Sequence, residues 1–469
     1  MSARQFTVFL HFACFLFIAR LALLLFFAPD LFADEAQYWY WSKHLDFGYY
    51  SKPPGIALAI AASTALFGDG EWAIRLPALF FYTMTAFWIY GLAAKIYDNK
   101  IALFSGLGFL LLPGVAVGSM VAATDALLLF FWAMALWGLV IAMKEQKTHG
   151  WYLMGCGIGL GLLSKYTMVF FYPCLLLYVL FSPPIWKVHQ RHIVIALMIS
   201  ILLFLPNVYW NWQHGFITLW HTAQISHLQQ SLIHPGKFLE FFGAQFGVFG
   251  PLFFAAFFFT IKKAWANPAE RLFVIFSWIP LSAFLLLAFL ARALANWAAP
   301  AYIAALPLVI AWMMQRPRFF PSAFFINASM ALMVMVFEPL NQAFALPKDI
   351  DPAKRMRGWQ DLGHEVQHHL AQAPQKPVIL VDNRRLAAEL LYYVRPMPEL
   401  VRWNPQGLIR DTFDLQTSMQ NLSNRLVLYL SDRPVCPPCS FFAVHPSAPT
   451  PFRVHQQTWY AWWLQGAKQ

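Results

Sequence analysis

Long apolar stretches that carry few charges are the feature that most limits how this chain can fold. Of the 469 residues, 59% are hydrophobic and 12% are charged, whereas soluble globular domains carry about 25% charged residues. A helix needs about 20 apolar residues to cross the hydrocarbon core of a bilayer. The sequence therefore predicts a mainly α-helical, polytopic membrane protein and excludes a soluble globular chain.

We expect about eleven transmembrane helices, with boundaries accurate to about three residues. Their approximate positions are 6–28, 72–97, 100–118, 120–143, 150–164, 166–182, 192–212, 245–261, 270–291, 296–314 and 319–338. The stretches at 150–164 and 166–182 are short, and one broken helix there would invert the topology of everything that follows. The first stretch exceeds the ~7–15-residue core of a signal peptide, so we expect it to be retained.

Lysine and arginine are distributed unevenly between successive loops, and this asymmetry predicts the orientation. With a cytoplasmic N-terminus, the few outward residues are Lys43, Lys52, Arg75, Lys165, Lys237 and Arg292. The first loop and the C-terminal tail then face outward. The net charge of +11 comes largely from the inward turns, so it indicates membrane anchoring and does not argue for nucleic acid.

The composition becomes that of a soluble protein after Glu338-Pro339. We predict a membrane domain over residues 1–343 and a separate domain over 344–469. In the second domain, 377–381 and 425–430 are typical of strands, and 384–394 is typical of an amphipathic helix. This alternation predicts a small α/β domain.

Two local motifs in the tail contain residue types that redox sites and metal sites use. Cys436 and Cys439 form Cys-Pro-Pro-Cys, where the prolines disfavour the helix that a redox motif needs, so we favour a structural disulfide over a redox site. His364-Glu365-Val366-Gln367-His368 matches H-E-x-x-H, which binds zinc on a helix. No third ligand is evident, so we predict no metal site and leave metal dependence open.

The segment 33–54, which reads ADEAQYWYWSKHLDFGYYSKPP, is the most informative part of the chain. Acids at the edge of a bilayer are costly, so Asp34 and Glu35 indicate a functional site. The apolar stretch that follows, between Gly48 and Asp69, is too short to span the membrane and suits an interfacial helix. We expect two interfacial helices in the first outward loop, joined at Lys52-Pro53-Pro54. The aromatic residues would form an interface belt.

These residue types suit transfer of a sugar from a lipid phosphate. The acceptor hydroxyl benefits from a carboxylate base, and the departing phosphate needs cations. The outward loops supply three acids, namely Asp34, Glu35 and Asp125. They also supply four cations, namely Lys52, Arg75, Lys165 and Arg292.

Each of these residues also has a structural interpretation. Asp34 and Glu35 point about 100° apart on a helix, so we assign the base role to Asp34 and a supporting role to Glu35. Both acids, and Asp125 after Thr124, could instead stabilise helix N-termini.

The cations have structural alternatives of their own. Lys52 and Arg75 could snorkel to lipid phosphates. Lys165 lies in an apolar stretch, where an ammonium needs a phosphate or carboxylate partner.

Several segments together resemble a bacterial membrane glycosyltransferase superfamily. They are the Asp-Glu before YWYWS, GYYSKPP, AIRLPA, the Thr-Asp that opens a span, GLGLLSKYT, WNWQHGF and NWAAPAY. The superfamily includes the protein O-mannosyltransferases and the lipid A aminoarabinose transferases, which share the fold called GT-C. The resemblance is specific for the superfamily, but it does not identify the sugar or the acceptor.

The resemblance implies inverting transfer from a polyprenyl-phosphate sugar, usually undecaprenyl phosphate, at the outer side of the bacterial inner membrane. The acceptor would be lipid A, a cell-envelope glycan or a protein, and no cofactor is required besides the donor. Asp34 matches the catalytic first-loop acid, Asp125 the second outward acid, and Lys52 the lysine at the donor phosphate. Lys165 and Tyr166 match the Ser-Lys-Tyr segment. Arg292 is not part of the resemblance, and we include it among the candidate site residues because it lies in an outward loop.

A transporter or flippase for a lipid-linked glycan is the alternative function. It predicts acids and cations buried along several spans. Here they gather in the outward loops, which favours the transferase.

Overall fold

The computed structural model describes residues 3–182, 184–226, 233–347, 349–422, 425–444, 448–455 and 457–467. The chain forms two compact units. The membrane unit contains Met1–Phe27 and Lys52–Phe344, and the C-terminal unit contains Ala28–Ser51 and Ala345–Gln469. The segment Ala28–Ser51, which the sequence placed with the membrane domain, therefore packs with the C-terminal part of the chain.

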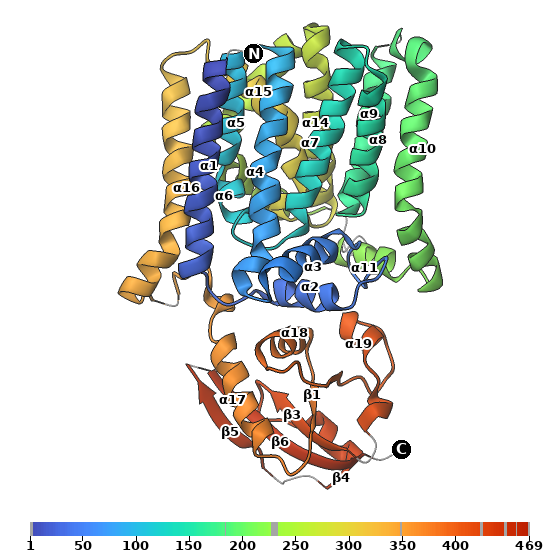
Figure 1. Ribbon diagram of the computed structural model, residues 1–469, viewed down its shortest axis with the longest axis vertical. Coiled ribbons are helices and arrows are strands. Elements are labelled where there is room, and N and C mark those ends of the chain that lie inside the picture. The colour runs from blue at the N-terminus through green and yellow to red at the C-terminus, as the bar shows by residue number, and fades with distance from the viewer. Residues whose placement is uncertain are drawn as a thin grey trace. The chain divides into compact units, whose positions relative to one another are not determined.

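All the regular secondary structure in the described residues of the membrane unit is helical (Figure 1). Its first elements are α1 (Ala3–Phe26), α3 (Gly55–Phe67), α4 (Glu71–Ile96), α5 (Asn99–Leu110), α6 (Pro113–Gly118), α7 (Thr124–Lys144), α8 (Thr148–Leu162) and the 3-10 helix η1 (Tyr166–Phe170). The remaining elements are α9 (Phe171–Leu180), α10 (Pro184–Gln213), α11 (Ile217–Ser226), α12 (Pro235–Phe249), α13 (Pro251–Ala266), α14 (Pro268–Leu290), η2 (Ala295–Ala298), α15 (Ala299–Met313) and α16 (Phe319–Phe344).

The expected count of eleven spans is not confirmed. In the described part of the chain, seven helices are long and apolar enough to cross a membrane, or eight if α12 and α13, which meet at 105°, form one span. The expected span 100–118 is divided at Pro113 into α5 and α6. The expected spans 150–164 and 166–182 correspond to α8, with 15 residues, and to η1 and α9. A helix of 15 residues is only about 22 Å long, whereas the hydrocarbon core is about 30 Å thick.

Close packing of α7 against α8 fixes the positions of the residues that follow α8. Glycine permits this approach: a Cβ on Gly138 would lie 2.6 Å from the carbonyl oxygen of Gly150. Asp125 lies in the first turn of α7, and Lys165 lies in the turn after α8. Because α7 and α8 pack together along their length (Figure 1), the start of α7 lies beside the end of α8.

The C-terminal unit is built on a six-stranded sheet with the order β2-β1-β3-β6-β4, in which β5 also pairs with β6. Its strands are β1 (Val378–Val381), β2 (Leu400–Arg402), β3 (Leu426–Ser431), β4 (Phe442–Val444), β5 (Thr450–Val454) and β6 (Gln457–Ala467). Strands β2, β1 and β3 are parallel, whereas β6 is antiparallel to β3, β4 and β5. The sequence prediction of a small α/β domain is confirmed.

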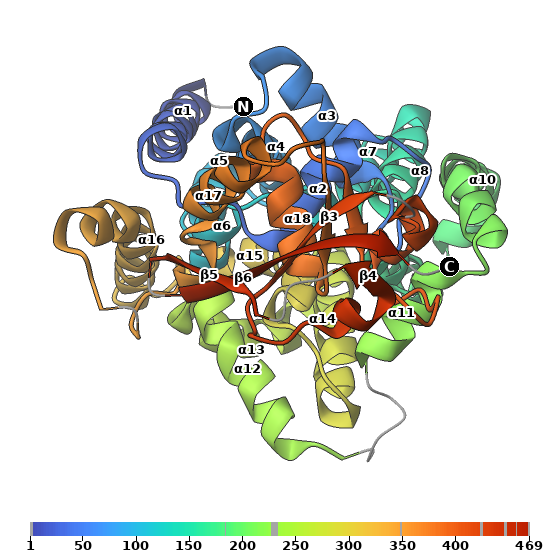
Figure 2. The same cartoon turned by 90° about the horizontal axis from the view of Figure 1, so that it is seen from below.

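The helices of this unit are α2 (Ala33–Lys43), η3 (Lys354–Met356), α17 (Trp359–Ala371), α18 (Arg384–Tyr393), α19 (Thr412–Gln416), η4 (Met419–Leu422) and η5 (Pro437–Phe441). Helices α17 and α18 lie on the same side of β6 (Figure 2). Val378, Leu380, Val427 and Leu464 belong to the buried core of the sheet.

The Cys-Pro-Pro-Cys motif forms the disulfide that the sequence favoured. Cys436 and Cys439 are bonded, with their Cα atoms 5.4 Å apart. Both half-cystines pack against the hydrophobic core of the sheet. This location favours a structural role for the bond.

The aromatic run of α2 is buried, which corrects the expectation of an interface belt. The side chains of Trp39 and Trp41 are 1% and 0% exposed. The Trp41 indole donates a hydrogen bond to the Thr412 hydroxyl over 3.0 Å, and the Trp39 ring contacts that of Tyr392 edge-on at 5.0 Å between centroids. Large aromatic rings with polar edges pack well where the edge finds a partner, and here the C-terminal unit supplies it.

Candidate functional site

Asp125 is the centre of a polar cluster in the membrane unit. The Lys165 ammonium donates to its Oδ1 over 2.7 Å, and the side chains of Lys165 and Asp125 are 12% and 9% exposed. The Asn296 amide donates to its other oxygen, Oδ2, over 3.0 Å. The carboxylate, which α7 carries, is thus held by one residue from the turn after α8 and one from η2.

Asp125 lies in the first turn of α7, which agrees with its structural interpretation at a helix N-terminus, but its side chain does not cap the helix. The N-cap position of α7 is occupied by Ala123, whose side chain has no acceptor. The carboxylate of Asp125 instead accepts bonds from distant segments. The prediction that Lys165 has an anionic partner is confirmed, and the partner in this structure is a carboxylate.

Tyr166 fixes the backbone beside Lys165. Its hydroxyl donates to the side-chain oxygen of Asn207 over 3.0 Å, and the Asn211 amide donates to the same hydroxyl over 3.3 Å. Asn207 and Asn211 lie one turn apart on α10 and are 0% and 5% exposed. Buried polar groups need such partners, so this network holds the turn that carries Lys165.

The Lys52-Pro53-Pro54 corner contacts the same turn. The N–H of Gly55 donates to the carbonyl oxygen of Leu163 over 2.7 Å. A Cβ on Gly55 would lie 2.7 Å from that oxygen and 3.0 Å from the Cα of Ser164, so only glycine fits here. The backbone of the corner therefore meets the turn that leads into Lys165.

The two arginines predicted to contact the donor have different surroundings. Arg75, near the start of α4, is 0% exposed, so it does not snorkel to the lipid surface. Arg292 follows α14 and lines a cavity of about 380 Å³ together with Lys237, Glu240 and Ala295. Ala295, which lines the cavity, immediately precedes Asn296, which bonds to Asp125. The cavity and the Asp125 cluster are therefore adjacent along the chain.

Asp34 is held by an arginine that sequence reasoning missed. Nη1 of Arg384, the first residue of α18, donates to Oδ1 of Asp34 over 2.8 Å. The same nitrogen donates to Oε1 of Gln37 over 2.9 Å. Both side chains of the Asp34–Arg384 pair are 41% exposed. Nothing in the local pattern around Arg384 identifies this role.

Glu35 has a structural role at the start of α2. Its Oε2 accepts a hydrogen bond from the backbone N–H of Phe32 over 2.9 Å, and the side chain is 0% exposed. This is the N-terminal stabilisation that the sequence offered as the structural alternative. Asp34 and Glu35 therefore differ in their surroundings, since the side chain of Asp34 is 41% exposed and Glu35 is fully buried.

Tyr49 and Tyr50 follow α2 and belong to the same buried surface. The Tyr49 ring stacks on Trp41 at 4.4 Å between centroids. Burial raises the pKa of the Tyr49 phenol to about 12, so the hydroxyl stays protonated and donates to the carbonyl oxygen of Trp41 over 3.1 Å. Burial also raises the pKa of Tyr50.

The H-E-x-x-H pattern lies on helix α17. His364 and His368 line an open pocket with Asp361 and His455. Nε2 of His455 lies 2.5 Å from Oδ2 of Asp361. Among the described residues, no three His, Cys, Asp or Glu side chains are placed to hold a metal ion.

Comparisons with known proteins place these observations in a family context. Residues 51–210 match the family described as dolichyl-phosphate-mannose-protein mannosyltransferase. The chain is 32% identical over 421 residues to the lipid A galacturonosyltransferase RgtD of Rhizobium johnstonii, and the match covers 88% of each chain. It is 30% identical over 133 residues to an undecaprenyl phosphate-alpha-4-amino-4-deoxy-L-arabinose arabinosyl transferase of Erwinia tasmaniensis, covering 27% of this chain and 24% of that one.

The fold is similar to that of ArnT from Cupriavidus metallidurans, solved bound to undecaprenyl phosphate. The TM-score is 0.72 at 15% sequence identity, and the match covers 98% of both chains.

Proposed function

Because this chain belongs to the bacterial GT-C membrane glycosyltransferases, the superfamily of the protein O-mannosyltransferases and lipid A aminoarabinose transferases, we propose that it transfers galacturonic acid from a polyprenyl-phosphate donor to lipid A. The observation that carries this proposal is the match to a lipid A galacturonosyltransferase along 88% of both chains. The flippase alternative is set aside, because the relatives are named as transferases.

The donor phosphate would bind beside the Asp125 cluster. The cavity next to Asn296 is lined by two cations, Lys237 and Arg292, and one acid, Glu240. A net positive cavity suits an anionic group. Lys52, at the corner docked on the turn before Lys165, and Arg75 would complete the neutralisation of the phosphate. The Asp125 carboxylate would hold Lys165 in place, and Tyr166 would hold the turn.

The chemical step would be an inverting displacement at the anomeric carbon. Asp34 would take the proton of the acceptor hydroxyl while the new carbon–oxygen bond forms. The bond to the phosphate breaks, and its electron pair leaves with the lipid phosphate, which needs cations but no general acid. Glu35 would support Asp34 by fixing the first turn of α2.

The donor is a membrane lipid, which agrees with the topology that the charge distribution predicts. We place the protein in the bacterial inner membrane as a multi-pass protein with a cytoplasmic N-terminus and a periplasmic C-terminal unit. A cysteine accessibility assay with an impermeant reagent would test this orientation. If the C-terminal unit is periplasmic, the impermeant reagent should label a cysteine introduced into that unit when it is added to intact spheroplasts.

A transfer assay in proteoliposomes tests the proposed function. The purified chain receives radiolabelled polyprenyl-phosphate galacturonic acid and lipid A, and transfer of label to lipid A is expected. Asp34→Asn should abolish transfer and leave donor binding largely intact. Arg292→Gln should weaken donor binding, whereas Arg433→Gln, at a side chain that is 80% exposed, should not.

Three outcomes would contradict the proposal. Movement of the labelled lipid across the bilayer without a new glycosidic bond would favour the flippase. Transfer from polyprenyl-phosphate aminoarabinose but not from the galacturonic acid donor would refute the sugar. Retained turnover in Asp34→Asn would remove Asp34 from the base role.

A further inference from the structure

Helix α2, which carries Asp34, is a structural part of the C-terminal unit. The backbone N–H of Leu31 donates to the Tyr393 hydroxyl over 2.6 Å. Trp41 bonds to Thr412, and Trp39 packs on Tyr392. The Arg395 guanidinium also lies over the Trp39 ring, 4.5 Å from its centroid. The position of Asp34 is therefore set by residues more than 300 positions later in the chain.

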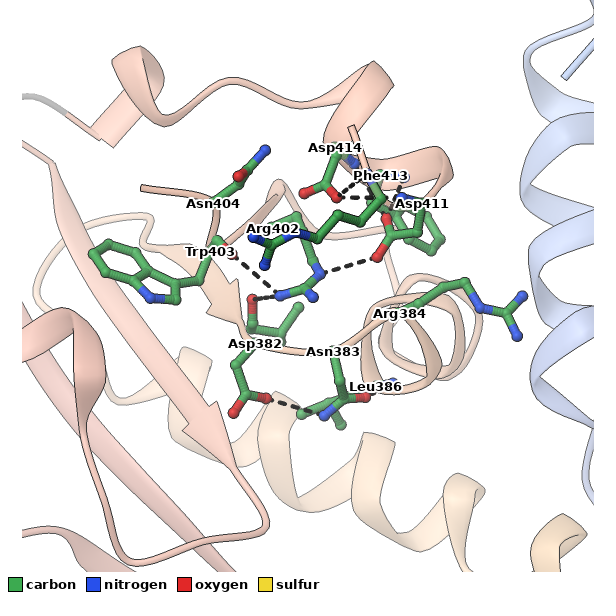
Figure 3. A network of polar contacts seen from close by, with 12 residues as sticks. Asp382, Asn383, Arg384, Leu386, Arg402, Trp403, Asn404, Asp411, Phe413 and Asp414 are labelled. Carbon is green, nitrogen blue, oxygen red and sulfur yellow. Dashed lines mark hydrogen bonds and ion pairs between the residues drawn. The ribbon is translucent and has the colours of Figure 1, made fainter. Parts of the chain in front are cut away.

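The start of α18 provides the direct contact to Asp34. Helix α18 begins immediately after β1, and the Asn383 side chain caps it by accepting from the N–H of Leu386 over 2.8 Å. Arg402, from the neighbouring strand β2, bonds to Asp411 instead. Figure 3 shows that Arg384 points away from Arg402 and Asp411. Its guanidinium is thus directed to α2 from a rigid, capped helix end.

We propose that Arg384 is a positioning residue for glycosyl transfer, which holds the carboxylate of Asp34 in the orientation that accepts the proton of the acceptor hydroxyl. The proposal rests on the base role given to Asp34 under the proposed function. One nitrogen of Arg384 donates hydrogen bonds to both Asp34 and Gln37, which lie one turn apart on α2. This contact occupies Oδ1 of Asp34 and leaves Oδ2 to take the proton.

An exposed carboxylate needs such a restraint to act as a base. The Asp34 side chain is 41% exposed, so without Arg384 it would rotate among its rotamers. A displacement of about 1 Å in a reacting group can slow an enzyme about 100-fold. An ion pair as exposed as this one contributes little to stability, so its removal tests positioning without unfolding the protein.

The test compares Arg384→Ala, Arg384→Lys and Arg385→Ala in the full chain. Arg385 is a matched control: it is the next residue of α18, and its guanidinium lies over Trp359 and donates to the carbonyl oxygen of Arg355. Transfer from polyprenyl-phosphate galacturonic acid to lipid A is measured as kcat and KM. Guanidinium chloride is added at millimolar, non-denaturing concentration.

We expect kcat of Arg384→Ala to fall about 10- to 100-fold, with KM for the donor within about twofold of wild type. Arg384→Lys should keep an intermediate kcat, and guanidinium should restore Arg384→Ala several-fold. Arg385→Ala should keep the wild-type kcat and show no rescue. A structural role alone would give neither the rescue nor the split between kcat and KM.

Other results would overturn the proposal. A wild-type kcat in Arg384→Ala, beside an inactive Asp34→Asn, would refute the positioning role and leave the proposed function standing. Equal losses in Arg384→Ala and Arg385→Ala without rescue would show a fold effect. Retained turnover in Asp34→Asn would refute the base role of Asp34 itself. This result can be told apart from a failure of the positioning role, because it does not depend on the Arg384 variants.

Discussion

Removal of one partner of the Asp125–Lys165 pair should destabilise the membrane unit strongly. The ammonium and carboxylate are 2.7 Å apart, and the side chains are 12% and 9% exposed. At an effective dielectric constant of about 20, the attraction is about 6 kcal/mol before the cost of desolvation. Because that cost is similar in size, the pair itself contributes little net stability. A lone charge left in place, however, costs about 3–5 kcal/mol.

Lys165→Met and Asp125→Asn should therefore each lower the free energy of unfolding by about 3–5 kcal/mol. The double variant leaves no lone charge, so it should recover most of the loss. The measurement is unfolding of the purified chain in mixed micelles with increasing dodecyl sulfate. Lys147→Met is the control, since Lys147 pairs with Glu145 at the surface, with 54% of its side chain exposed, and its removal should cost under about 1 kcal/mol.

The transfer assay separates stability from function in the same variants. The double variant should fold but not transfer sugar, because the phosphate site has lost a cation. Single variants as stable as wild type would refute the reasoning that the pair is buried. A double variant whose loss equals the sum of the single losses would show that the two side chains do not interact.

Four further outcomes are expected from three other parts of the structure. Asp30 accepts the first N–H of α17 over 2.7 Å, so Asp30→Ala should cost about 0.5–2 kcal/mol and speed amide exchange in α17. Burial raises the pKa of Asp30, so the folded state holds its proton more tightly. Stability should therefore fall as pH rises from the unfolded pKa through the folded one, and Asp30→Asn should remove this dependence. Cys436→Ser should lower the stability of the C-terminal unit by about 2 kcal/mol from chain entropy. Transfer that stops under a mild reductant before the unit unfolds would instead indicate a redox role for Cys436 and Cys439. Gly55→Ala should reduce transfer, because the added Cβ meets a carbonyl oxygen at 2.7 Å. Gly247→Ala, where a Cβ meets nothing within 4 Å, should not, and equal effects on the transfer rate would exclude the steric cause.

Much of the C-terminal unit could be predicted from local sequence patterns. The expected strands at 377–381 and 425–430 and the helix at 384–394 agree with β1, β3 and α18 to within one residue at each end. Apolar runs flanked by turn residues report directly on burial in a sheet. The number of spans was less predictable, because breaks such as the one at Pro113 interrupt apolar runs that hydropathy reads as continuous.

By itself, the sequence determined that the chain enters a membrane, that a small α/β unit follows, and which acids and cations are costly enough to indicate a site. Only the tertiary structure decided how those residues are paired. Lys165, Asn296 and Arg384 meet their carboxylates across separations of 40, 171 and 350 residues. Composition and periodicity report on local burial, whereas a pairing across such distances depends on which elements the packed core brings together.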